Sequence, residues 1–128
     1  MAGSYYMEKV VEKSGFVHHS NDAEDMPMDG GATIRWLITH RDGAENYSMR
    51  LITVKKGKST PHHHHDYEHE IFIISGRVRV QLDGKMYVAK ADDFIFIPPN
   101  VEHGMDAEED TRMICVVPIK AAKMILGE

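Results

Sequence analysis

Short apolar-rich segments separated by turn residues make up most of the chain between residues 33 and 118. They are rich in β-branched and aromatic residues, and several alternate between apolar and polar positions, as half-buried strands do. The predicted strands are 33–39, 47–54, 70–75, 77–82, 86–89, 94–97 and 111–117. An Asp-Gly pair at residues 83 and 84 predicts a tight hairpin between two of them. Short strands at this regular spacing indicate an all-β sandwich or barrel.

The chain is predicted to form a single domain in three parts. Residues 1–32 form an N-terminal arm and loop, because the acidic stretch 18–31 ends in Gly-Gly and has no strand pattern. Residues 33–118 form the β-barrel, and residues 119–128 form a tail or a short helix. A chain of 128 residues is long enough to bury a core without crosslinks.

Alternation within the segment 47–54 divides its side chains between two faces. Met49 and Leu51 share one face, which we expect to line the barrel, and Arg50 lies on the opposite face. An inward-facing Arg35 or Arg50 could orient a carboxylate. The alternation along the strand, however, predicts an outward or interface position for Arg50.

The composition narrows the classes of partner. The formal net charge of −5 argues against nucleic acid or an anionic membrane as the main partner. No segment reaches the roughly 20 apolar residues of a membrane span, and residues 1–10 lack the apolar core of a signal peptide. The only cysteine, Cys115, excludes a disulfide within the chain and is predicted to be a core residue, with a position lining the site as the alternative. These features predict a cytoplasmic protein.

The candidate chemistry is concentrated in residues 57–76, GKSTPHHHHDYEHEIFIISG, which contain five of the nine histidines. Side chains on a strand alternate faces, so His63 and His65 project to one side and His62 and His64 to the other. Rings at such positions are about 6 to 7 Å apart along the strand and can converge on one ion. Imidazole suits Zn, Fe, Ni and Cu, and binds Mn less tightly.

Two further histidines stand at predicted strand starts. His69 opens the strand that contains Ile71 and Ile73, and if it faces inward, Glu70 faces outward. His103 follows Pro98-Pro99-Asn100, a stiff turn in which Asn tolerates a positive φ. Asp66, Tyr67 and Glu68 are expected to form the loop at the mouth of the site, and His40 is expected to be exposed.

These spacings resemble the two motifs of the cupin superfamily over residues 33–118. The first motif is Gly, five residues, His, one, His, three or four, Glu, six, Gly. It is matched here by Gly57, His63, His65, His69 in the glutamate position, and Gly76. The second motif is Gly, five, Pro, one, Gly, two, His, three, Asn. It is matched by Asp92, Pro98, Asn100, His103 and Ala107, with three departures.

The resemblance implies a cupin double-stranded β-helix, or jelly-roll barrel, that holds a divalent transition metal. Residues 63–72 are similar to the first motif of small single-domain bacterial cupins that carry four histidines and bind manganese or a similar ion. By that resemblance the metal ligands are His63, His65, His69 and His103. The alternative is that Glu70 swings inward and replaces His69. Manganese is the favoured ion, and Fe, Zn, Ni and Cu suit the same donors.

The expected function is metal-dependent, oxygenase-like chemistry on a small, partly apolar molecule. The alternatives are a non-catalytic module that binds a small ligand or senses the metal, and a Lewis-acid isomerase or lyase. No catalytic residue is assigned. Candidate pocket-lining residues are Met49, Leu51, Ile71, Ile73, Phe94, Phe96, Met105 and Met113. The resemblance also implies a homodimer, for which the face that bears Glu70, Phe72 and Ile74 offers apolar area.

Overall fold

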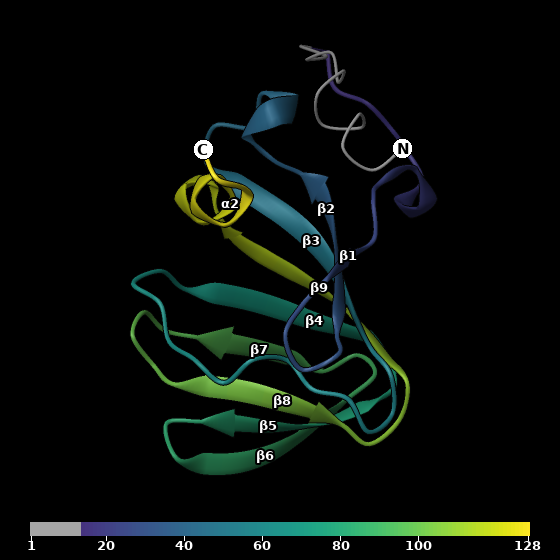
Figure 1. The fold of residues 1–128 in the computed structure, drawn as a ribbon, viewed down its shortest axis with the longest axis vertical. Helices are drawn as coiled ribbons and strands as arrows, with labels where there is room; N and C mark the ends of the chain where they lie inside the picture. Colours follow the sequence, from purple (N-terminus) through teal and green to yellow (C-terminus); the bar gives the residue numbers. More distant parts are fainter. Residues whose placement is uncertain (1–13) are drawn as a thin grey trace.

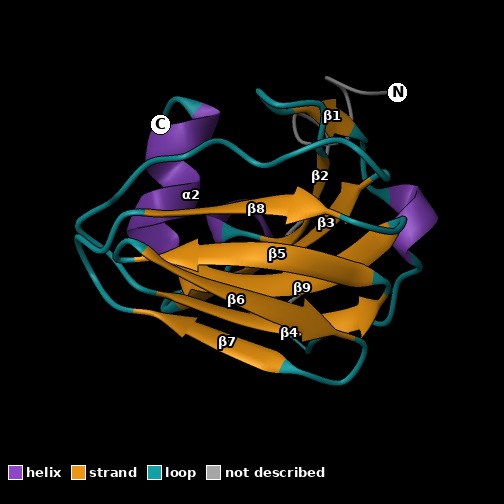
Figure 2. Ribbon diagram, turned by 90° about the horizontal axis from the view of Figure 1, so that it is seen from below, coloured by secondary structure: helices purple, strands orange, loops and turns teal. Residues whose placement is uncertain are grey.

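The described part of the chain folds into two antiparallel β-sheets that enclose one core, with the helix α2 (Ile119–Leu126) at one end (Figures 1 and 2). The computed structural model describes residues 14–128, so the part of the predicted arm before residue 14 lies outside the described residues. The predicted all-β jelly-roll architecture is confirmed.

The larger sheet has six strands in the order β1-β2-β3-β9-β4-β7, and the smaller sheet has three in the order β6-β5-β8. The strands are β1 (Met26–Pro27), β2 (Thr33–Ile38), β3 (Tyr47–Val54), β4 (His69–Ser75), β5 (Arg77–Leu82), β6 (Lys85–Lys90), β7 (Phe94–Ile97), β8 (His103–Ala107) and β9 (Thr111–Pro118). Buried residues from both sheets form the core.

The backbone angles at the turns agree with the turns predicted from the sequence. Asp83 and Gly84 have φ angles of 51° and 78°, as a two-residue hairpin between β5 and β6 requires. Asn100 also has a positive φ, 66°, and the turn before β8 is built as expected. Asp92 has a φ of 74° at a position where the cupin motif has glycine, which explains why the motif prefers glycine there.

Two strands are missing from the predicted set, although a strand start at His103 was expected. β1 is short and pairs with β2 inside a stretch that was interpreted as a loop. β8 has the sequence His-Gly-Met-Asp-Ala, which has low strand propensity because glycine and aspartate disfavour strands. It is nevertheless a strand because it pairs along its whole length with β5, from Val78 opposite Ala107 to Leu82 opposite His103.

The prediction for Arg50 was wrong. Arg50 faces the barrel interior and is only 5% exposed, whereas Met49 and Leu51 lie on the other face of β3. Residues 16–23 border that other face near Met49, so both faces of β3 are covered and the apolar alternation does not identify the inner one. Met49 and Leu51 therefore do not line the barrel interior.

Phe94 and Phe96 were also placed on the wrong face. They are 82% and 53% exposed, whereas Ile95 and Ile97 of the same strand are buried. β7 pairs with β4 so that Phe94 lies opposite Phe72 and Phe96 opposite Glu70, which puts all four on the outer face of the sheet.

The helix α2 (Ile119–Leu126) follows β9 directly. It is the only α-helix within residues 14–128, and no helix in that part of the chain is long and apolar enough to cross a membrane. Glu128, just beyond the helix, accepts a hydrogen bond from Arg41 Nε at 2.6 Å and also pairs with His40. His40 was predicted to be exposed, but its side chain is only 12% exposed because of this contact.

Candidate metal centre

The histidine-rich segment runs beside β8, and this pairing sets the position of two rings. The backbone N–H of His63 donates to the carbonyl of His103 at 3.0 Å, and the N–H of His103 donates to the carbonyl of His63 at 2.9 Å. Thr60 and Met105 form a further bond of the same ladder at 2.9 Å. Because two backbone hydrogen bonds join His63 and His103, the register of both residues is fixed.

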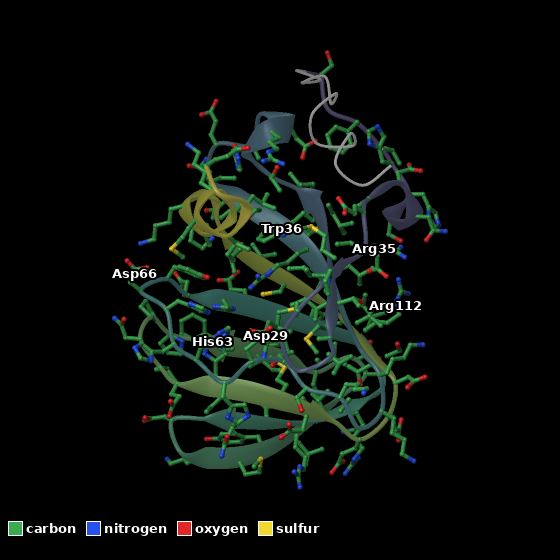
Figure 3. The ribbon with its side chains drawn as sticks, viewed as in Figure 1. Asp29, Arg35, Trp36, His63, Asp66 and Arg112 are labelled. Atoms are coloured by element: carbon green, nitrogen blue, oxygen red, sulfur yellow. The ribbon has the colours of Figure 1, made fainter. Side chains whose placement is uncertain are left out.

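The side chains of His63, His65 and His103 meet inside the barrel. Their ring centroids are 4.1 Å apart for His63 and His65, 5.0 Å for His63 and His103, and 5.6 Å for His65 and His103. One ring nitrogen from each lies within 4.8 Å of the others. In Figure 3, His63 lies between the two sheets, while Asp66 lies at the outer edge of its loop.

His69, the first residue of β4, adjoins this trio. Its ring centroid is 4.8 Å from that of His103 and 5.2 Å from that of His65. The side chain is 4% exposed, and its Nε2 atom is buried without a hydrogen-bond partner. Glu70 is exposed on the opposite face of β4, as expected if His69 faces inward.

Two neighbours act on the Nδ1 atom of His69. Arg50 Nη2 lies 3.4 Å from it and Cys115 Sγ lies 3.7 Å from it. A guanidinium can only donate, so the contact with Arg50 uses the Nδ1 lone pair and leaves the ring proton on Nε2. In the other tautomer, Nδ1–H points toward the sulfur of Cys115 and the Nε2 lone pair is free for a metal.

His103 is held in one tautomer by the backbone. Its Nδ1 atom lies 2.9 Å from the carbonyl oxygen of Val101, which can only accept, so the proton is on Nδ1. The Nε2 lone pair is then available. Metal-binding histidines commonly use this arrangement, in which the second ring nitrogen donates to a carbonyl.

Burial keeps the four rings neutral. The pKa of His69 is lowered to about 2, first by desolvation and then by the nearby Arg50 charge. Desolvation also lowers the pKa of His63 to about 4, with His65 and His103 adding to the effect. The pKa values of His65 and His103 are lowered for the same first reason. At neutral pH the cluster therefore consists of uncharged imidazoles, the form that binds metal.

This donor set fits a divalent transition metal. Neutral imidazole nitrogens suit Zn, Cu, Fe and Ni, and the unpartnered Nε2 of His69 is a buried polar atom that an ion could satisfy. The structure brings together the four histidines that the sequence predicted. His69 lies beside the other three and is not part of the group whose ring nitrogens lie within 4.8 Å of one another. His62 and His64 are exposed on the other side of the segment.

A pocket of about 490 Å³ opens beside His63 and His65. Residues from five parts of the chain line it: Met26, Pro27, Met28, Asp29, Ile34, Trp36, Arg50, Pro61, His63, His65, Tyr67 and Ile125. The segment 26–29, which was interpreted as part of a loop, thus forms one wall. The lining is largely apolar, as is common for small-molecule sites.

Tyr67 was expected in the loop at the mouth of the site, and its side chain is buried there, with 4% exposed. Its ring stacks on that of His65, with centroids 4.7 Å apart and an interplanar angle of 3°. Its hydroxyl is buried without a partner, and burial raises the pKa of the phenol. Only the strand-like spacing of residues 65, 67 and 69 could have indicated this inward position.

The remaining lining candidates are core residues. Ile71, Ile73, Met105 and Met113 are buried and belong to the hydrophobic core. Cys115 is also a buried core residue, and its sulfur lies beside His69 at the edge of the candidate metal centre.

Comparison with known proteins gives concordant results. The family model described as Cupin domain matches residues 50–118. The chain is 31% identical over 101 residues to polyketide synthase CurC of Streptomyces cyaneus, covering 76% of this chain and 66% of that protein. It is 30% identical over 86 residues to L-ectoine synthase of Halalkalibacterium halodurans, covering 66% of each. The alignments thus span just under two thirds of both relatives.

A solved structure is also similar. The polyketide cyclase RemF from Streptomyces resistomycificus superposes with a TM-score of 0.74 at 28% identity, covering 82% of this chain and 80% of that one. The similarity extends over most of both chains, so it includes both sheets of the barrel.

Proposed function

This chain belongs to the cupin superfamily, and on that premise we propose that it is a metal-dependent enzyme that acts on a small, partly apolar molecule. The observation that carries the proposal is the meeting of His63, His65, His69 and His103 beside a pocket of about 490 Å³. The relatives named as polyketide cyclase and L-ectoine synthase support small-molecule chemistry in this superfamily.

The four histidines are proposed to hold one divalent ion, with manganese the first candidate and Fe, Zn, Ni or Cu the others. Four neutral ligands leave the charge of the ion near +2, because none of them is a carboxylate. A bound divalent ion would supply Lewis-acid or redox chemistry toward an anionic substrate oxygen.

The protein groups around the centre have separate tasks. Val101 keeps the proton of His103 on Nδ1, and stacking on Tyr67 orients the ring of His65. Met26, Met28 and Ile125 line the pocket with apolar surface and limit the access of water. Substrate would therefore meet the histidines in a dry environment, where electrostatic interactions are stronger.

The proposed reaction class is oxygenase-like, and a second class is favoured by one observation. The Tyr67 hydroxyl lies buried without a partner in a side chain that stacks on His65. Because burial raises the pKa of Tyr67, the phenol keeps its proton at neutral pH and could donate it to substrate, as a Lewis-acid isomerase, lyase or cyclase would need.

Metal analysis of untagged protein tests the proposal first, because a purification tag would add histidines of its own. Oxygen uptake is then followed with enolisable diketones and styrene-like alkenes after loading with Mn, Fe or Zn. Oxygen consumption with Mn or Fe, but not with Zn, supports the oxygenase class. Turnover that persists with Zn and without oxygen supports the Lewis-acid class. Metal binding without turnover of any substrate supports a non-catalytic binding module.

We also propose that the chain forms a homodimer through the outer face of the six-stranded sheet. Phe72 and Phe94 are cross-strand neighbours there, and Phe96 and Ile74 extend the apolar surface. Contiguous exposed apolar surface of this kind commonly marks an interface.

A further inference from the structure

Arg50 is a buried cation at the wall of the pocket. It is 5% exposed, and its guanidinium carbon lies 5.2 Å from the centre of the Trp36 ring, its cross-strand neighbour. Its Nη2 atom lies 3.4 Å from His69 Nδ1, a long contact, and donates to Cys115 Sγ, a weak acceptor, at 3.5 Å. Its Nε atom is buried without a hydrogen-bond partner.

Among the residues that the structure describes, no anion neutralises this charge. Within residues 14–128, no carboxylate forms an ion pair with Arg50. Arg35, Arg41, Arg77 and Arg79, by contrast, each pair with a carboxylate near the surface. A buried cation without an anion is costly, because a cation–π contact recovers only part of its lost hydration. Such a group inside a pocket is a candidate for ligand recognition.

The pocket offers a second polar group and an apolar wall. The side chain of Tyr67, whose buried hydroxyl has no partner, borders the same pocket as Arg50. Met26, Met28, Ile34 and Ile125 provide the apolar lining. Among the described residues, Asp29 is the one carboxylate that lines the pocket, and it is exposed. The volume of about 490 Å³ suits a small organic molecule.

We propose that Arg50 is the specificity-determining residue that binds the carboxylate of a small, partly apolar organic acid beside the four histidines. The proposal rests on the proposed function, since it takes this pocket to be the substrate site. The guanidinium supplies charge-assisted hydrogen bonds to the carboxylate, and the apolar part of the acid packs against the methionines and Ile125. A neutral analogue of equal shape lacks that interaction.

The chain has an internal reporter for this test. Trp36 is its only tryptophan, and it lies against Arg50 and lines the pocket. Binding of phenylacetate and hexanoate is compared with that of phenylacetamide and hexanamide, by Trp36 fluorescence and by calorimetry. The full chain is measured zinc-loaded and again after chelation, at about pH 7.5, where the imidazoles are neutral.

We expect each acid to bind at least about tenfold more tightly than its amide in both forms, the effect of one charge-assisted hydrogen bond. Arg50→Gln should reduce this preference to about twofold or less. Arg50→Lys, which keeps the charge without the planar fork, should retain part of it. Arg112→Gln, on the exposed face of β9, should retain all of it.

The outcomes separate the two proposals. No preference for the acids in the wild type, or an equal preference in Arg50→Gln, overturns the role of Arg50. If Arg50→Gln does not fold, the acid–amide comparison in the wild type and in Arg50→Lys decides. Zinc content is measured on the same samples. Protein that binds no metal but prefers acids would refute the proposed function alone, and metal binding without that preference would refute the role of Arg50 alone.

Discussion

His103 illustrates how a single backbone contact can prepare a side chain for its role. The carbonyl of Val101 holds the Nδ1 proton, so the other nitrogen is presented to the interior with its lone pair free. His69 has no such carbonyl, and its tautomer depends on the balance between Arg50 and Cys115. The two rings are thus prepared for a metal to different degrees.

His63→Ala is expected to weaken divalent-metal binding at least about tenfold, because it removes one of the proposed ligands. His64→Ala is the matched control: it changes the same residue type one position away, where the side chain is exposed. Calorimetric titration of chelated protein with Zn²⁺ measures both. Equal affinities for the two variants would contradict the proposed ligand set.

The lowered histidine pKa values predict how stability depends on pH. The pKa values of about 4 for His63 and about 2 for His69 lie below the value of 6.5 expected in the unfolded chain. Between pH 6.5 and 4 the unfolded state therefore binds more protons than the folded state, so metal-free protein loses stability as the pH falls. We expect a loss of about 1 kcal/mol per pH unit for each of these two histidines, measured by urea unfolding between about pH 7 and 5.

The variant His69→Gln removes one of the histidines responsible and should show a shallower dependence on pH. An unchanged slope would mean that protons bind elsewhere on the unfolded chain.

Part of the candidate site could be predicted from the residues alone. The spacing of the histidines specified which side chains meet, because strand geometry and the cupin motifs both constrain it. The inward positions of Arg50 and Tyr67 were not predicted, although an inward Arg50 was considered. The inner face of β3 cannot be recognised by apolar alternation when both faces are covered, and Tyr67 stands among charged residues that are typical of a loop.

At the scale of elements, the site depends on a strand with a weak sequence signal. β8 contributes His103 and pairs with β5 on one side and with the segment around Thr60 and His63 on the other. Long-range pairing therefore overrides the low local propensity. Most other strand positions were predicted because their β-branched and aromatic residues agree with the final sheet.

Gly76, between β4 and β5, cannot carry a side chain. Its φ is +96°, and an added Cβ would lie 2.3 Å from the carbonyl oxygen of Asp110 and 2.6 Å from the Cα of Thr111. Gly76→Ala should destabilise the fold by about 2 to 4 kcal/mol, since both backbone strain and a backbone clash oppose it.

Gly84→Ala is the control for strain alone. Gly84 has a φ of +78° but no atom within 4 Å of the added Cβ, so a cost of about 1 kcal/mol is expected. Urea unfolding of both variants measures the difference. A cost for Gly76→Ala no larger than that for Gly84→Ala would show that the connection between β4 and β5 can move.

At the scale of the whole molecule, the outer face of the larger sheet has an unusual composition. Phe94 is 82% exposed although large aromatic side chains are usually buried. The sequence indicated an apolar outer face through Phe72 and Ile74, but the strand pairing was needed to show that Phe94 and Phe96 belong to it.

Phe94→Glu should convert the proposed dimer to monomers at micromolar concentration, because it places a charge on the apolar face beside Phe72. Met124→Glu, at an exposed apolar position on α2, serves as the control and should remain dimeric. Light scattering coupled to size-exclusion chromatography gives the mass of each. A monomeric wild type would contradict the proposed dimer.

Two of the four histidines belong to different sheets: His69 starts a strand of the larger sheet, and His103 starts a strand of the smaller one. An ion bound to both would fasten the two halves of the barrel to each other at one end. Its escape would then require the halves to separate there, so its dissociation rate should follow how often that end of the barrel opens. Amide hydrogen exchange around residues 63 and 103 would report the same opening events.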